Sequence, residues 1–195
     1  MAKVDRNGRA ATLSDDELEA LLEAAPSPRY RCLWAIQRWT AGRIGESLAL
    51  RWGDLNGVVT YRKATTKTKA TRQVPTAPRL TEEIEAYRKA WAQEHGHTPS
   101  KEEVLFPALG STTTPQSRQA ADKALRQTCA RLGLEGVSTH SFRRSLFSGS
   151  LATRAWDPWA TIWKQTKARC WPPSQAAETT ENALPTGQGQ AGIIP

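Results

Sequence analysis

Residues 42–55 read Gly-Arg-Ile-Gly-Glu-Ser-Leu-Ala-Leu-Arg-Trp-Gly-Asp-Leu, and this stretch says most about the fold. It follows a helix predicted over about residues 29–40, which Gly42 breaks. The apolar residues that come next predict a short further helix that ends before Gly53. Arg43 therefore lies at a turn between two helices, where it could cap the second helix or face a ligand.

More helices and one small sheet are predicted around this stretch. Ser14 precedes a helix that ends near Ala25, and Glu17 completes a capping box with it. Residues 58–61 are rich in β-forming side chains, and extended structure resumes at 71–74 after a polar, basic turn, which predicts a hairpin. The remaining expected elements are helices at 80–93 and 117–132, a brief buried segment at 105–107, and a helix that carries residues 140–143 and is capped by Ser138 or Thr139. The predicted fold class is α+β, mainly helical with a small antiparallel sheet.

The sequence predicts one domain at residues 12–150, after a disordered lead-in at 1–11 and before a poorly ordered tail at 151–195. From Ser148 to the end, 48 residues include only five that are Leu, Ile, Val, Met or Phe, yet four Trp fall within 156–171. One interpretation of this tail is a disordered extension. The other is translation in a reading frame that was never selected to encode protein, as a single-base insertion or deletion would produce.

The charge of the chain favours a polyanionic partner. Lys and Arg number 27 against 19 Asp and Glu, which gives a net charge of +8 and a sequence pI of about 9.8. Residues 55–81 and 136–156 contain no acidic side chain, and both stretches hold several basic ones. Two such stretches on one face would form the electrostatic surface expected of a nucleic-acid-binding protein. A solvated basic surface without a ligand is the alternative.

Cysteine usage and hydropathy indicate the cellular setting. Cys32, Cys129 and Cys170 are an odd number at wide spacing, which argues against a disulfide framework and a zinc site. No apolar stretch approaches the 18 residues of a membrane span, and the N-terminus lacks the apolar run of a signal peptide. We therefore expect a cytoplasmic protein with no membrane contact.

Three short motifs follow one another along the chain. The first is the stretch at 42–55, in which Arg43 follows a small residue and precedes Ile-Gly-Glu. The second is Lys67, which stands eight residues before the Pro of Arg-Gln-Val-Pro at 72–75. The third is His140-Ser-Phe-Arg143. Together the three motifs resemble the catalytic domain of tyrosine recombinases, the phage integrase family, and the resemblance covers about residues 12–150.

The resemblance implies DNA breakage and rejoining through a 3′-phosphotyrosyl link. Arg43 and Arg143 would hold the non-bridging oxygens of the scissile phosphate as its negative charge increases. Lys67 would protonate the 5′-oxygen leaving group, and His140 would transfer a proton or donate a hydrogen bond to the phosphate. The arginines supply the positive charge, so no metal and no cofactor are expected. The implied partners are double-stranded DNA and other recombinase protomers. Further DNA contacts are expected from Arg62, Lys63, Lys69, Arg72 and Arg144.

The sequence departs from the family where the nucleophile should lie. Trp163 stands 23 positions after His140 and could occupy the place of the family's second His or Trp. Beyond it, residues 172–176 read Pro-Pro-Ser-Gln-Ala, and all three tyrosines lie at or before residue 87. Alkyl hydroxyls are poor substitutes for a phenol as nucleophile and leaving group. No nucleophile is found, so the sequence predicts a catalytically defective recombinase domain.

The part of the chain before the first predicted helix is too short for the family's usual N-terminal DNA-clamping domain, which is expected to be missing. Two other functions stay open: a non-catalytic DNA-binding module or regulator derived from an integrase, and a relative of type IB topoisomerases. The compact motif spacing fits integrases better than topoisomerases. Whether the chain is an enzyme is left open.

Overall fold

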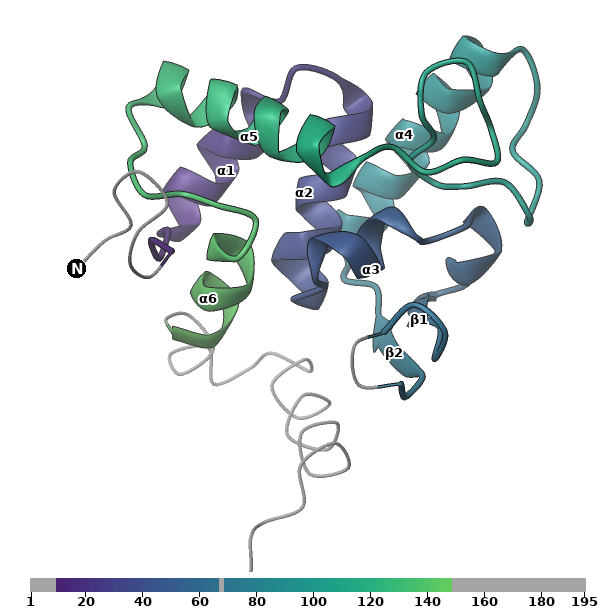
Figure 1. Cartoon of the computed structure of the whole chain (residues 1–195), viewed down its shortest axis with the longest axis horizontal. Helices are drawn as coiled ribbons and strands as arrows, with labels where there is room; N and C mark the ends of the chain where they lie inside the picture. Colours follow the sequence, from purple (N-terminus) through teal and green to yellow (C-terminus); the bar gives the residue numbers. More distant parts are fainter. Residues whose placement is uncertain (1–9, 67–68, 149–195) are drawn as a thin grey trace, which may run out of the picture. The chain divides into compact units, whose positions relative to one another are not determined.

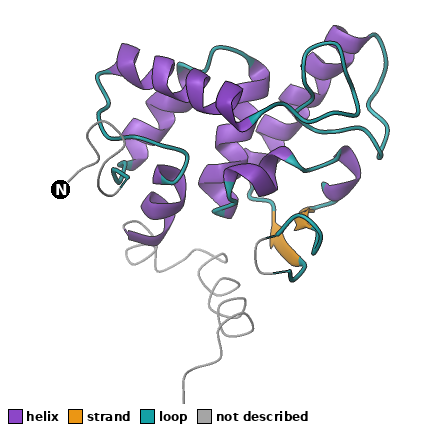
Figure 2. Cartoon of the chain, viewed as in Figure 1, coloured by secondary structure: helices purple, strands orange, loops and turns teal. Residues whose placement is uncertain are grey.

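This computed structural model describes residues 10–66 and 69–148 (Figures 1 and 2). They form helices and one two-stranded antiparallel sheet, joined by loops. The elements are α1 (Asp15–Glu23), α2 (Pro28–Thr40), α3 (Ile44–Leu48), the 3-10 turn η1 (Trp52–Asp54), β1 (Val58–Tyr61), β2 (Arg72–Pro75), α4 (Pro78–His95), α5 (Arg118–Leu132) and α6 (Ser141–Ser148). The mainly helical α+β fold class is confirmed. The predicted tail at 151–195, Trp163 and Lys67 lie outside the described residues.

Local sequence signals account for where the first helices begin and end. The Ser14 hydroxyl accepts from the Glu17 N–H and the Glu17 carboxylate accepts from the Ser14 N–H, so the predicted capping box is confirmed. A proline at the first position of α2 suits its fixed φ. Ala41 ends α2 in the left-handed conformation, with φ of 51°. That conformation is uncommon for a residue with a Cβ, and it turns the chain sharply into Arg43.

The core is built around α2, which contacts α1, α3, α4 and α6 (Figure 1). Its residues 32–36 are all buried. Tyr87 of α4 stacks on Trp52 and on Phe106, with centroid separations of 5.7 Å in both pairs. The short segment at 105–107 is therefore tied to the core, as the sequence predicted. Because α2 is enclosed by its neighbours, the position of its C-terminal end is fixed.

The sheet pairs β1 with β2 in a register that joins Val58 to Pro75 and Tyr61 to Arg72. Side chains alternate in β1, so Val59 and Tyr61 are buried. The predicted hairpin is confirmed, and its polar turn connects the two strands.

Three expectations differ in detail from the structure. The third helix ends at Leu48, and a separate 3-10 turn follows before the sheet. The last described helix begins after His140, whose carbonyl accepts from the Arg144 N–H (3.0 Å), so Ser138 and Thr139 are not its cap. Ordered structure also begins before residue 12, because the N–H of residue 11 donates to the Gly136 carbonyl (2.9 Å). The rest of the predicted lead-in, residues 1–9, lies outside the described residues.

Candidate functional site

A cavity of about 320 Å³ opens where α3, the hairpin turn, the start of α5 and the start of α6 meet. Its lining includes the side chains of Arg43, Arg118 and Arg143, together with that of His140. The structure thus brings together three of the four residues that sequence predicted as catalytic. The fourth, Lys67, lies outside the described residues. Thr65 and Thr66, just before it, do line the cavity.

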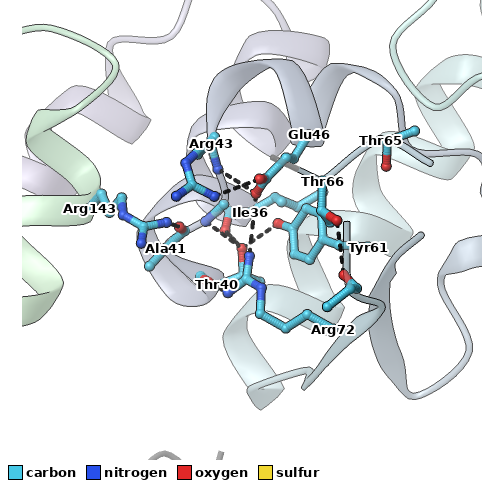
Figure 3. Close-up of polar contacts among 12 residues, drawn as sticks. Ile36, Thr40, Ala41, Arg43, Glu46, Tyr61, Thr65, Thr66, Arg72 and Arg143 are labelled. Carbon is cyan, nitrogen blue, oxygen red and sulfur yellow. Dashed lines mark hydrogen bonds and ion pairs between the residues drawn. The ribbon is translucent and has the colours of Figure 1, made fainter. Parts of the chain in front are cut away.

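Arg43 occupies the N-cap position of α3, and Glu46 holds it there. The Glu46 carboxylate accepts from the Arg43 guanidinium (2.8 Å) and from the Arg43 backbone N–H (3.3 Å) (Figure 3). The Glu46 side chain is only 5% exposed, whereas 37% of the Arg43 side chain is accessible. The carboxylate therefore fixes one edge of the guanidinium and leaves another part of it facing the cavity. Glu46 thus supports the local fold by pairing with an arginine.

Arg143 reaches the cavity from α6 and donates to the Ala41 carbonyl (2.8 Å) (Figure 3). Burial and the nearby positive charges of Arg43 and Arg72 lower the pKa of Arg143 from its usual value. The two neighbouring guanidiniums contribute the smaller part of this shift, because their positive charges repel that of Arg143. An anion bound in the cavity would relieve that repulsion. His140 is exposed at the same rim, one turn before Arg143.

Arg72 lies beneath the cavity rather than on an open face. Its guanidinium stacks over the Tyr61 ring at 4.4 Å and donates to the Thr40 carbonyl (2.9 Å). Only 18% of its side chain is exposed, and its second terminal nitrogen lies 3.8 Å from the Glu46 carboxylate. The pairing of Tyr61 with Arg72 across the hairpin accounts for this orientation, because paired residues project from the same face of a sheet.

The other residues expected to contact DNA divide into two groups. Lys63 and Lys69 are exposed on the hairpin turn. Arg62 donates to the Ala49 carbonyl (2.9 Å) and pairs with Asp54 (3.2 Å), so it also ties the turn to the chain before β1. Arg144 donates to the carbonyl of residue 10 and joins α6 to the N-terminal segment.

The structure adds one cationic residue that the sequence reasoning missed. Arg118 begins α5, next to its cap Ser117, and its guanidinium covers Gly45. A Cβ placed on Gly45 would lie 2.2 Å from Arg118 Nη2, so the absence of a side chain there makes room for this arginine. Within residues 10–66 and 69–148, Arg118 makes no hydrogen bond and no ion pair. A basic residue directly after a helix cap was visible in the sequence, but nothing local indicated that it lines the same cavity as Arg43.

The described parts of the chain hold no cluster of three or more His, Cys, Asp or Glu side chains able to bind a metal ion. They also hold no helix long and apolar enough to cross a bilayer.

Comparison with known proteins finds one matching family and several similar solved structures. The sequence profile described as the phage integrase family matches residues 11–160. No curated protein sequence matches the chain significantly. Similar solved structures include the XerH site-specific recombinase bound to its difH substrate (24% identity, TM-score 0.56), the XerA recombinase (16%, 0.59) and a lambda integrase dimer bound to a core site (14%, 0.60).

These structural matches cover 73%, 86% and 82% of this chain but only 43%, 67% and 57% of the respective recombinases. The chain therefore spans roughly half the length of the proteins that it resembles. At these identities the likeness supports the fold, while the profile match over residues 11–160 supports the family.

Proposed function

Because the chain belongs to the phage integrase family, we propose that its domain binds duplex DNA and holds one phosphodiester between Arg43 and Arg143. The observation that carries this proposal is their convergence on one cavity from α3 and α6, about 100 residues apart in sequence. His140 lies at the same cavity. Three phosphate-binding side chains in one small cavity are a more specific feature than a basic surface.

The geometry suits a phosphate whose negative charge increases during reaction. Guanidinium groups donate pairs of hydrogen bonds to phosphate oxygens and keep their charge at any physiological pH. Glu46 orients Arg43 and the Ala41 carbonyl orients Arg143, so neither side chain has to be ordered when the ligand arrives. Preorganised donors of this kind are usually the largest contribution to stabilising a charged transition state.

The positive charge of the chain and the DNA bound in similar solved structures both support DNA as the ligand. The turn carries exposed Lys63 and Lys69 beside the cavity, and the whole chain has a net charge of +8. XerH and lambda integrase were solved bound to DNA sites. Lys67 remains a predicted general acid on the same turn, and His140 a predicted proton donor or phosphate ligand.

We propose further that the chain does not cleave DNA with a tyrosine of its own. Its three tyrosines are Tyr30, Tyr61 and Tyr87, and the last two are fully enclosed in the core. The Tyr61 hydroxyl lies beneath the cavity but is bonded to Thr40 Oγ1 (2.5 Å), and burial raises its pKa. Tyr30 is half-buried on α2 beside Trp34. None of the three lines the cavity.

Gel retardation and a nicked suicide substrate test both parts. The purified protein should retard duplex DNA at low salt and form no covalent adduct. Arg43→Ala and Arg143→Ala should each weaken binding roughly ten- to hundredfold, as expected for lost charge-assisted hydrogen bonds. Arg126→Ala is the matched control, because this arginine is exposed on α5 and pairs only with Asp122 in the described structure. Equal loss of DNA affinity in all three variants would show that binding depends on net positive charge and not on this site. A covalent phosphotyrosyl adduct would refute the proposed absence of cleavage.

A second candidate function is favoured by the intact cavity: the domain could complete a strand-exchange assembly in which a competent recombinase supplies the tyrosine. In a mixed assembly, Arg43→Ala and Arg143→Ala would then abolish cleavage at the site this chain occupies. If the chain is a non-catalytic DNA-binding module, the same changes would weaken binding and leave the partner's cleavage unchanged.

A further inference from the structure

Two arginines from distant elements hold consecutive carbonyl oxygens at the C-terminal end of α2. Arg72 of β2 donates to the Thr40 carbonyl (2.9 Å), and Arg143 of α6 donates to the Ala41 carbonyl (2.8 Å) (Figure 3). Helix C-terminal carbonyls carry partial negative charge and lack helical partners, so both bonds are favourable. The turn that follows leads directly into Arg43. The orientation of the Arg43 side chain therefore depends on the positions of these two carbonyls.

Glu46 lies between Arg43 and Arg72 and is almost completely buried. Its Oε1 accepts from Arg43 at 2.8 Å, and its Oε2 lies 3.8 Å from Arg72 Nη2. A buried carboxylate is stable as an anion only when opposite charges and hydrogen bonds surround it. With Arg72 removed, Glu46 would keep one of these two cationic neighbours and would be expected to change its contact with Arg43.

The Tyr61 ring fixes the plane of the Arg72 guanidinium. The stacking distance is 4.4 Å, and the Tyr61 hydroxyl bonds to Thr40 Oγ1, whose own carbonyl accepts from Arg72. Thr40 Oγ1 also donates to the Ile36 carbonyl (2.6 Å) inside α2. Strand, helix end and guanidinium thus form one connected polar network with little exposed surface.

We propose that Arg72 is a positioning residue: it connects the hairpin to the end of α2 and to Glu46, and so aims Arg43 at the phosphate without touching DNA. The proposal rests on the proposed function for its phosphate ligand. This role replaces the expectation from sequence that Arg72 contacts DNA directly. The Arg72 guanidinium is largely buried and stacks on Tyr61, so it presents little surface to a ligand.

A double-mutant cycle on DNA affinity distinguishes a positioning role of Arg72 from a direct contact with a DNA phosphate. If Arg72 acts through Arg43, Arg72→Met should lower affinity about tenfold in the natural chain and less than about twofold in the Arg43→Ala background. A direct phosphate contact would instead give equal losses in both backgrounds, with a further fall of about 0.9 in the salt slope. Lys63→Ala, on the exposed turn, is the control for such an additive contact.

The DNA affinity of Arg72→Lys tests whether the positive charge of Arg72 is sufficient for its role. A lysine keeps the charge but cannot both stack on Tyr61 and donate to Thr40 from one planar group. A positioning role therefore predicts that lysine fails to restore affinity, while a phosphate contact predicts that it does. If the methionine variant does not fold, the lysine variant takes its place in the cycle, and circular dichroism identifies which variant is folded.

The Nε–Hε resonance of Arg43 in an NMR spectrum without DNA tests the proposal independently of binding. Replacing Arg72 should shift this resonance, whereas Lys63→Ala should leave it in place. An unmoved Arg43 signal, or additive losses in the cycle, would overturn the positioning role. A natural chain that fails to retard DNA would refute the proposed function instead, and the NMR comparison would still decide the role of Arg72.

Discussion

Gly42 is the residue at which one added methyl group should do the most damage, and Gly42→Ala is our principal prediction. A Cβ built there would lie 2.2 Å from the Tyr61 hydroxyl, 2.9 Å from Tyr61 Cζ and 2.7 Å from Ser47 Oγ. The backbone at Gly42 does not have a positive φ, so the cost is steric rather than conformational. Tyr61 cannot yield by moving into solvent, because it is completely buried and stacked against Arg72.

The magnitude follows from two contributions. Overpacking a closed core typically costs about 1–3 kcal/mol. Moving the Tyr61 hydroxyl away from Thr40 would leave buried polar atoms unpaired, at about 1–3 kcal/mol more. The free energy of unfolding should therefore fall by about 2–6 kcal/mol, which corresponds to a fall in Tm of roughly 6–18 °C for a domain of this size.

Urea and thermal unfolding followed by circular dichroism measure this change, and Gly45→Ala is the matched control. A Cβ on Gly45 also meets an atom at 2.2 Å, but that atom is Nη2 of the exposed, flexible Arg118. Since Gly45 lies within α3, alanine should leave stability within about 1 kcal/mol or raise it through helix propensity. Equal destabilisation by the two variants, or none by Gly42→Ala, would show that the packing around Tyr61 is not as described.

Three further predictions concern binding, a buried hydrogen bond and alkaline pH. Arg118→Ala should weaken duplex DNA binding several-fold in gel retardation yet leave Tm unchanged, because the described structure gives this arginine no hydrogen bond to lose. Tyr87→Phe should lower the unfolding free energy in urea by about 1–3 kcal/mol, since the Leu105 carbonyl loses its buried donor at 2.9 Å; an unchanged value would contradict this. Burial raises the pKa of the Tyr61 phenol and of the Cys32 thiol above their ordinary values of 10.0 and 9.0. Their contribution to stability is complete below these values, and it falls as pH rises from them toward the raised pKa values of the folded state, because the unfolded chain releases the protons first. Tm should fall from about pH 9 upward, and less steeply in Cys32→Ala.

Features coded by neighbouring residues were predictable from the sequence. The capping box of Ser14 and Glu17 and the hairpin with its turn depend on contacts within a few positions, and both are present. The same holds for the support that Glu46 gives Arg43, because residues three apart in a helix lie on one face. Boundaries were less certain where two signals compete, as at the last described helix, where His140 rather than Ser138 or Thr139 precedes the first turn.

The residue types of the site were also readable, because phosphate chemistry demands groups that stay cationic and donate in pairs. The resemblance to the phage integrase motifs indicated Arg43, His140 and Arg143, and the fold brings all three to one cavity. Lys67 and Trp163 stay predictions, since they lie outside the described residues.

Tertiary structure alone decided how the other arginines are used. Arg72 and Lys69 looked alike in sequence as basic residues of one hairpin, yet Arg72 lies under the cavity on Tyr61 and Lys69 is exposed. Arg118 joins the cavity because α5 packs against α3, more than 70 residues away in the chain. Local propensity fixes which residues form a strand or a helix. Which arginine is buried among partners and which is left facing a cavity depends on the packing of distant elements, and that is set by the core as a whole.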